Sequence, residues 1–144
     1  MRQTVNVEQK IIGEAEAIWK TISKGEDVHK WFPTVIQSCR LKRANGKLFR
    51  SCTMYDGSLL QETIVEIDDK ARKFVYTVDE HPLPASKIMT TIKVKYVENK
   101  LTSITWSAEF TVEEENIPLV EETLREIYTQ GIQSLENWHQ KNLK

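Results

Sequence analysis

Two charged residues, Arg50 and Glu62, are the side chains whose types could do chemistry together in this 144-residue sequence. A glutamate can act as a general acid or base, and a neighbouring arginine can stabilise an enolate or a similar anion. Such a pair would serve a cyclase or a lyase. The sequence contains no GxSxG elbow, Walker loop, GxGxxG fingerprint or HExxH pair, so nucleophilic and cofactor-dependent catalysis are disfavoured. We expect no cofactor.

Metal binding is also disfavoured. Cys39 and Cys52 lack CxxC spacing, and the three histidines (His29, His81 and His139) are scattered along the chain. Neither pattern resembles a zinc or haem site. We therefore expect no metal site.

The composition predicts one domain over residues 1–144, because this length is common for a single hydrophobic core. Twenty basic and twenty-one acidic side chains give a net charge of -1, so no global field favours nucleic acid. No apolar run approaches the roughly 20 residues that span a bilayer, and the N-terminus lacks an apolar signal region. We expect a soluble, cytoplasmic monomer or homodimer without stable membrane insertion.

The first third of the chain predicts a strand and two short helices. A strand near residues 3–12 is followed by "GEAEAIWKTISKG", whose apolar residues recur at helical spacing and which Gly25 can end. Asp27 can cap a second short helix, "VHKWF". Pro33 ends that helix, because proline lacks an N–H and disfavours helix at the preceding residue. The chain is then released into a strand.

From residue 35 the pattern is that of β-structure. Runs near 35–43, 47–55, 59–68, 72–80, 86–97 and 100–112 are separated by short turn sequences, which predicts an antiparallel meander. The final segment, "IPLVEETLREIYTQGIQSLENWHQ", predicts a long helix with one apolar face: Val120, Leu124, Ile127, Gly131, Leu135 and Trp138. We expect an α+β fold in which seven curved strands wrap this helix. An elongated cavity should lie between the sheet and residues 118–138.

A two-residue turn at Asn45–Gly46 fixes the pairing of the strands beside it. It places Cys39 opposite Cys52 and Leu41 opposite Arg50, on one side of the sheet. A disulfide between the two cysteines is sterically conceivable at such a pair. In the cytosol, however, we predict free thiols.

The face of Glu62 depends on the next turn. A two-residue Asp56–Gly57 turn sends Glu62 to the other face, whereas a three-residue loop through Ser58 puts it beside Cys52. On the outer face, Glu62 and Arg50 would be solvated charges. On the inner face they would need each other, and because a buried ion pair is often no better than apolar packing, a ligand role would be indicated.

The remaining strands turn alternate apolar side chains inward, so Lys93 and Lys95 should point to water. For Tyr76, Trp106 and Tyr128, packing in the core is the alternative to ligand contact. Gly131 marks either a close approach of the sheet or room for a ligand. We expect the ligand-binding residues to be Gln37, Cys52, Met54, Tyr76, Ile92, Trp106, Tyr128 and Gly131.

The order of these elements resembles the START-like helix-grip superfamily, especially its polyketide cyclase/dehydrase and lipid-transport group. The resemblance covers almost the whole chain and is carried by "AEAIWKTI", "VHKWFPTV", "LLQETIVEIDDKARKFVYTV", "EHPLPASKIMTTIKV" and "ITWSAEF". It implies a helix-grip fold and a hydrophobic small molecule in the grip cavity. It also favours the three-residue loop, and hence the inward face for Glu62.

Two groups of relatives allow comparison by residue. "FRSCT" and "QETIVEID" resemble the segments that carry the catalytic arginine and glutamate of lachrymatory factor synthases, which implies Arg50 and Glu62. "FPTVIQSC" resembles a segment of abscisic acid receptors, but Gln37 stands in place of the carboxylate-binding lysine. Pro82 replaces the latch arginine and "MYDGSLL" is too short for a gate loop, so a gated receptor for a carboxylate hormone is disfavoured.

Three functions follow. The first is binding or transport of a hydrophobic or amphipathic small molecule. The alternative is a cofactor-independent cyclase, dehydratase or lyase that uses Arg50 and Glu62, and a second alternative is a ligand-responsive regulatory protein.

Overall fold

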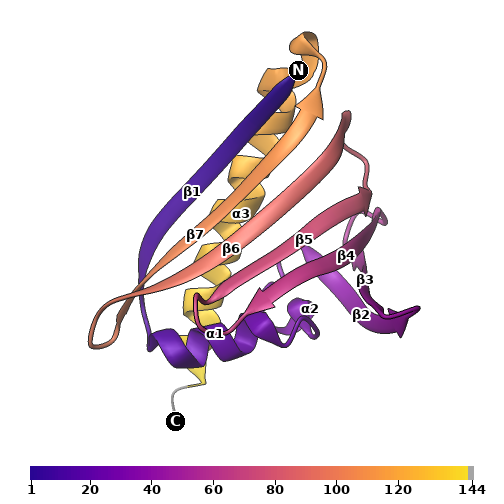
Figure 1. Cartoon of the computed structure of the whole chain (residues 1–144). Coiled ribbons are helices and arrows are strands. Elements are labelled where there is room, and N and C mark those ends of the chain that lie inside the picture. The colour runs from indigo at the N-terminus through magenta and orange to yellow at the C-terminus, as the bar shows by residue number, and fades with distance from the viewer. Residues whose placement is uncertain (143–144) are drawn as a thin grey trace.

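The computed structural model describes residues 1–142 and contains a seven-stranded antiparallel sheet in the order β1-β7-β6-β5-β4-β3-β2. The long helix α3 lies across one face of the sheet, with the short helices near its C-terminal end (Figure 1). The predicted α+β helix-grip architecture is confirmed. The elements are β1 (Arg2–Ile12), α1 (Ala15–Ser23), α2 (Val28–Trp31), β2 (Ile36–Ala44), β3 (Lys47–Met54), β4 (Leu59–Asp68), β5 (Lys73–Glu80), β6 (Ala85–Glu98), β7 (Leu101–Val112), η1 (Glu114–Asn116) and α3 (Ile117–Lys141).

Strand alternation forms the core as predicted. Lys93 and Lys95 of β6 are exposed, whereas Ile92 and Val94, which alternate with them, are buried. Because successive side chains of a strand point to opposite faces, one face of β5, β6 and β7 is continuous and apolar. None of the following inward residues is more than 5 % exposed: Phe74, Tyr76, Ile88, Thr90, Ile92, Val94, Ile104, Trp106, Ala108 and Phe110.

The elbow between α1 and β2 follows the glycine and proline signals. Gly25 adopts φ 74°, a left-handed conformation that suits glycine, and α2 ends at Trp31, two residues before Pro33. The predicted capping role of Asp27 is wrong. Its backbone is left-handed (φ 60°) rather than extended, and its side chain makes no capping hydrogen bond.

A β-bulge corrects the predicted face of Gln37. Cys39 pairs with Cys52 and Leu41 with Arg50, as expected from the Asn45–Gly46 turn. The register then shifts between Ile36 and Ser38, where an extra residue on β2 opposes β3. Gln37 is consequently exposed, and Ile36, which is 5 % exposed, takes the inward position.

Helix α3 buries a stripe that is rotated slightly from the predicted one. Val120, Leu124 and Leu135 are buried as expected, while Ile127 and Trp138 are only half-buried. Two further residues on the same face, Tyr128 and Ile132, are buried instead. Within residues 1–142, no helix is long and apolar enough to cross a membrane.

Gly131 lies where α3 packs tightly against Trp106 of β7. A Cβ atom at this position would collide with Cζ3 of Trp106, and it would lie 2.9 Å from Cη2 of the same ring and 3.1 Å from Cε2 of Phe32. The Trp106 ring cannot move aside easily, because it stacks on Tyr128 with ring centroids 5.1 Å apart. The close approach that the glycine predicted is therefore present.

We expect Gly131→Ala to lower the free energy of unfolding by about 1–2 kcal/mol. Alanine gains about 1 kcal/mol of helix propensity, but overpacking a rigid ring costs about 1–3 kcal/mol, and the short Cβ contact places this site at the upper end. Chemical denaturation checks the result. Ser134→Ala on the same helix is the control, because its side chain is only half-buried. A stabilised Gly131→Ala variant would show that the ring has room to move.

Candidate functional site

A cavity of about 330 Å³ lies between the sheet and α3. Its walls come from α1 and α2, from the inner faces of β2 to β7, and from α3 at Thr123, Leu124, Ile127 and Tyr128. The predicted cavity is thus present, but it is shorter than residues 118–138. It does not extend along the helix to Gly131, because Trp106 packs against α3 there. Its volume is in the range of small-molecule sites.

Arg50 and Glu62 face each other across β3 and β4. Residues 55–58 connect the two strands, and the backbone N–H of Met54 donates to the carbonyl of Ser58 at 2.9 Å, so the turn closes around the three residues Tyr55, Asp56 and Gly57 rather than around the favoured three-residue loop through Ser58. The expected register, with Glu62 beside Cys52, is therefore wrong by two residues. Since a shift of two residues keeps each side chain on its face, Glu62 remains inward, directly opposite Arg50.

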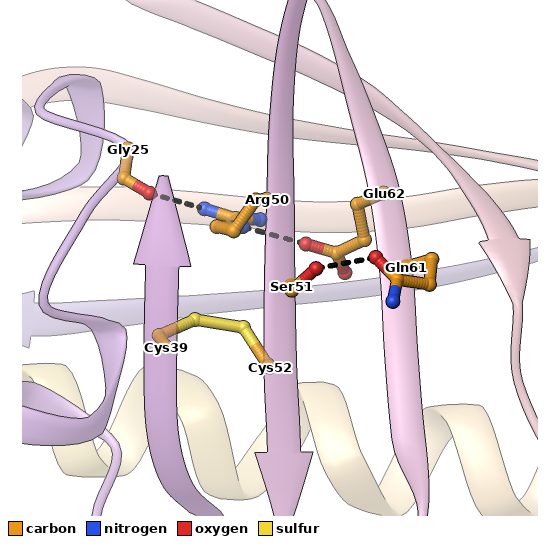
Figure 2. The surroundings of a disulfide bond; sticks show 7 residues. All are labelled: Gly25, Cys39, Arg50, Ser51, Cys52, Gln61 and Glu62. Atoms are coloured by element: carbon orange, nitrogen blue, oxygen red, sulfur yellow. Dashed lines mark hydrogen bonds and ion pairs between the residues drawn. A yellow bond between two sulfur atoms is a disulfide. The ribbon is translucent and has the colours of Figure 1, made fainter. Parts of the chain in front are cut away.

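The two side chains form a buried ion pair (Figure 2). Arg50 Nε donates to Glu62 Oε1 at 2.6 Å, and each residue is 6 % exposed. Arg50 Nη1 also donates to the carbonyl of Gly25 at 3.2 Å. The guanidinium carbon lies 5.5 Å from the ring centroid of Phe74 and 4.9 Å from that of Tyr76. The pair therefore has no net charge, and the Arg50 guanidinium is fixed by Glu62, by the Gly25 carbonyl and by two aromatic rings.

Aromatic side chains form the cavity wall beside the ion pair. Trp106 Nε1 donates to the Tyr76 hydroxyl at 3.3 Å, and the hydroxyls of Tyr128 and Thr90 share a hydrogen bond at 3.1 Å. Burial raises the pKa of Tyr76 and of Tyr128, and the Glu62 charge adds to this effect. Both phenols consequently stay neutral at physiological pH and keep their protons for hydrogen bonding.

Most of the predicted site residues border the cavity, together with Arg50 and Glu62. Gln37 is exposed, because it sits at the bulge, and Gly131 is covered by Trp106, so neither lines the cavity. The roles of all these residues in binding or catalysis remain predictions. The predicted residues that do line it are Arg50, Cys52, Met54, Glu62, Tyr76, Ile92, Trp106 and Tyr128.

The structure corrects the prediction of free thiols. Cys39 and Cys52 are joined by a disulfide, with their Cα atoms 4.1 Å apart (Figure 2). The expectation of free thiols rests on a reducing compartment, where disulfides are rare. The disulfide follows from the strand register, which places the two cysteine side chains opposite each other on one face of the sheet. The bond links β2 to β3 next to the cavity, whose wall includes Cys52.

Several residues that line the cavity were not predicted from the sequence. Trp31 and Phe32 form one end of the wall, and His81 and Leu83 contribute from the loop between β5 and β6. Burial lowers the pKa of His81, which favours its neutral form. The aromatic pair immediately before Pro33 was the available signal, but a helix of four residues is too short for periodicity to show which side faces inward.

The donor set at the cavity does not suit a metal. Among residues 1–142, no three His, Cys, Asp or Glu side chains lie together in a way that could hold a metal ion. The one carboxylate in the buried part of the cavity, Glu62, is already bonded to Arg50.

Comparison with known proteins extends over nearly the whole chain. Residues 2–138 match the sequence profile of the family described as polyketide cyclase / dehydrase and lipid transport. No curated protein matches the sequence.

Solved structures share the fold. XoxI from Bacillus cereus is 25% identical, with a TM-score of 0.84 and 94% of both chains covered. An uncharacterised protein from Bacillus thuringiensis is 28% identical, with a TM-score of 0.78 over 94% of this chain and 97% of that one. Norcoclaurine synthase from Thalictrum flavum, solved with dopamine and hydroxybenzaldehyde, is 17% identical, with a TM-score of 0.79 over 99% of this chain and 88% of the other. At that identity the last comparison shows the fold alone.

Proposed function

Because the chain belongs to the polyketide cyclase/dehydrase and lipid-transport family, we propose that it binds or carries a hydrophobic or amphipathic small molecule between its sheet and α3. We keep the predicted cytoplasmic location and the monomer or homodimer state as parts of this proposal. The cavity supports the proposal most directly. It is lined mainly by apolar and aromatic side chains, with only a few polar groups, which is the usual composition of a small-molecule site.

The ion pair supports a catalytic role as the second candidate function. Each charge loses solvation when it is buried, so the pair contributes little net stability compared with apolar packing. A buried charge pair on a cavity wall is also a common arrangement in active sites. In this candidate, Glu62 would exchange a proton with the ligand and Arg50 would stabilise the resulting anion, as in a cyclase, dehydratase or lyase.

Native mass spectrometry of the purified protein tests the binding proposal. A carrier releases the co-purified molecule unchanged, an enzyme converts it on incubation, and a ligand-responsive regulator changes its association state when the molecule is removed. A protein that carries no small molecule and binds none from a panel of apolar and amphipathic compounds would contradict the proposal.

For the catalytic candidate we expect Glu62→Gln to lower turnover of the co-purified molecule by about 100-fold or more. The amide keeps the shape of the side chain and can still accept from Arg50, but it cannot take up a proton. Affinity for an uncharged ligand should stay within about threefold. The measurement is single-turnover conversion followed by mass spectrometry.

Glu66→Gln is the matched control on the same strand. Glu66 lies 3.5 Å from Lys73 with a side chain that is 42% exposed, so its loss should leave both turnover and binding unchanged. If Glu62→Gln converted the molecule at the rate of the unmodified protein, Glu62 would not be the proton-transfer group.

A further inference from the structure

The two edge strands of the sheet, β1 and β2, differ in what covers them. Side chains of α3 bond to the backbone of β1: Arg125 Nη1 donates to the carbonyl of Asn6 at 3.2 Å, and the N–H of Ile12 donates to Glu136 Oε2 at 2.7 Å. Strand β2 lies at the opposite edge (Figure 1). Apart from β3, no part of the described chain bonds to the backbone of residues 38–44. The edge of β2 is therefore open.

The turn between β2 and β3 shows which backbone groups face this open edge. Both residues of the Asn45–Gly46 turn have positive φ (52° and 76°), as in a type I′ turn, which closes on a hydrogen-bonded pair, here Ala44 and Lys47. Bonded and non-bonded pairs alternate along an antiparallel ladder, and the Cα separation of 4.1 Å between Cys39 and Cys52 fits a non-bonded pair. The residues that direct their N–H and C=O groups to the open edge are consequently Cys39, Leu41 and Arg43.

This edge is positively charged, although the whole chain has a net charge of -1. Residues 36–47 contain Arg40, Lys42, Arg43 and Lys47 and no acidic residue. None of these four forms an ion pair with another residue of the described chain. Like charges opposite each other destabilise a strand pair, so β2 of a second copy is a poor partner for this edge. An acidic strand has the complementary charge.

We propose that the open edge of β2 binds an extended acidic segment of a partner protein as an added antiparallel strand. This interaction surface goes beyond the proposed small-molecule binding. Main-chain hydrogen bonds to Cys39, Leu41 and Arg43 provide affinity, and alternate side chains provide specificity. Arg40 and Lys42 are exposed on the outer face, whereas Leu41 is half-buried on the inner face. The partner segment therefore alternates acidic residues, which face Arg40 and Lys42, with apolar ones.

The peptide acetyl-GEVEVEVG-amide is the probe, and backbone methylation separates strand pairing from charge attraction. In the antiparallel arrangement the valines lie opposite the odd-numbered residues of β2, so their N–H groups bond to β2 and those of the glutamates point away. N-methylation of the valines should raise the Kd about tenfold or more, whereas N-methylation of the glutamates should change it by less than about threefold. Titration of ¹⁵N-labelled protein followed by NMR measures both values. Equal affinity of the two methylated peptides, or the reverse order, would overturn antiparallel strand addition.

Charge reversal tests the specificity. Arg40→Glu combined with Lys42→Glu should raise the Kd of the acidic peptide about tenfold or more and create binding of acetyl-GKVKVKVG-amide. The matched control is Lys93→Glu combined with Lys95→Glu, because these lysines are also exposed but lie on β6, which is paired on both sides. At about 0.15 M salt the control should bind the acidic peptide within about twofold of the unmodified protein. Equal loss in both variants would show unspecific attraction and overturn the proposal.

Hydrogen exchange of the unmodified protein provides a test without substitutions. In the free protein, the amides of Cys39, Leu41 and Arg43 should exchange faster than those of Arg40 and Lys42, which bond to β3. The acidic peptide should slow the three fast amides about tenfold or more. Slow exchange of all five amides in the free protein would show that the edge is already covered, by a second copy or otherwise, and would overturn the proposal.

Two further outcomes would also overturn it: no binding of the acidic peptide at millimolar concentration, or equally tight binding of a short thymidine oligonucleotide, which has charge but no strand backbone. Neither outcome would affect the proposed binding of a small molecule, because the cavity lies between the sheet and α3.

Discussion

Arg50→Met lowers the free energy of unfolding by about 3–5 kcal/mol, because it leaves the Glu62 carboxylate buried without its partner. The same change removes the hydrogen bond to the Gly25 carbonyl and the contacts of the guanidinium with two aromatic rings. Urea denaturation followed by circular dichroism measures the effect. We also expect weaker binding of ligands with a polar end and loss of any cyclase or lyase turnover, while a hydrocarbon probe still binds.

Two further variants separate an unpaired buried charge from a general loss of packing. Arg50→Met combined with Glu62→Leu removes both charges, so it should recover most of the lost stability. Arg2→Met removes an arginine whose partner Glu109 lies at 3.5 Å and whose side chain is 46% exposed, and it should cost no more than about 0.5 kcal/mol. If Arg50→Met unfolded at the urea concentration of the unmodified protein, Glu62 would have solvent or another partner available.

Breaking the bond between Cys39 and Cys52 should lower the free energy of unfolding by about 3 kcal/mol. The cysteines are 13 residues apart, and cross-linking a loop of about 15 residues restricts the unfolded chain by roughly that amount. The paired variant Cys39→Ala with Cys52→Ala tests this, and its truncation of Cys52, which is 3 % exposed, adds a small packing loss.

Reductant provides the control for the disulfide. Dithiothreitol should destabilise the unmodified protein by a similar amount and leave the paired variant unaffected. Thiol titration of the denatured protein, prepared under non-oxidising conditions, should find no free thiol before reduction and two afterwards. Two reactive thiols without reductant, together with unfolding that reductant does not change, would contradict the bond.

The regular parts of the fold could be predicted, because the spacing of apolar and polar residues along the sequence shows which side chains share a face. Trp106, Ala108 and Phe110 alternate with the polar residues Ser107 and Glu109, and Lys93 lies between buried residues, so these strand faces followed directly from a period of two. The pairing of Leu41 with Arg50 was also predictable, because the two-residue Asn45–Gly46 turn determines which residues of the two strands lie opposite each other.

Features that add or shift one residue were not visible in the sequence. The bulge at Gln37 changes which side of β2 faces inward without any glycine or proline to mark it. The loop around Gly57 admits more than one three-residue alignment, and the choice moved the partner of Glu62 from Cys52 to Arg50. Both differences arise from backbone hydrogen bonding, which composition does not determine.

The site was only partly predictable, because a cavity forms where packed side chains leave space, and the periodicity of the sequence does not show where that space lies. Ile127 and Tyr128 of α3 both border the cavity, whereas the sequence predicts Tyr128 as a ligand contact and places Ile127 only on the apolar face of the helix. Trp31 was missed because its helix spans four residues.

The pairing of β1 with β7 has a consequence for synthesis of the chain. Ile12 at the end of β1 pairs with Leu101 at the start of β7, so 101 − 12 = 89 residues separate these partners. At about 5–20 residues per second, the ribosome makes β1 roughly 4–18 s before the strand that will hydrogen-bond to it. During that interval the successive hairpins from β2 to β6 can pair locally. The slow step in completing the sheet is therefore the addition of β1, which is synthesised first but paired last.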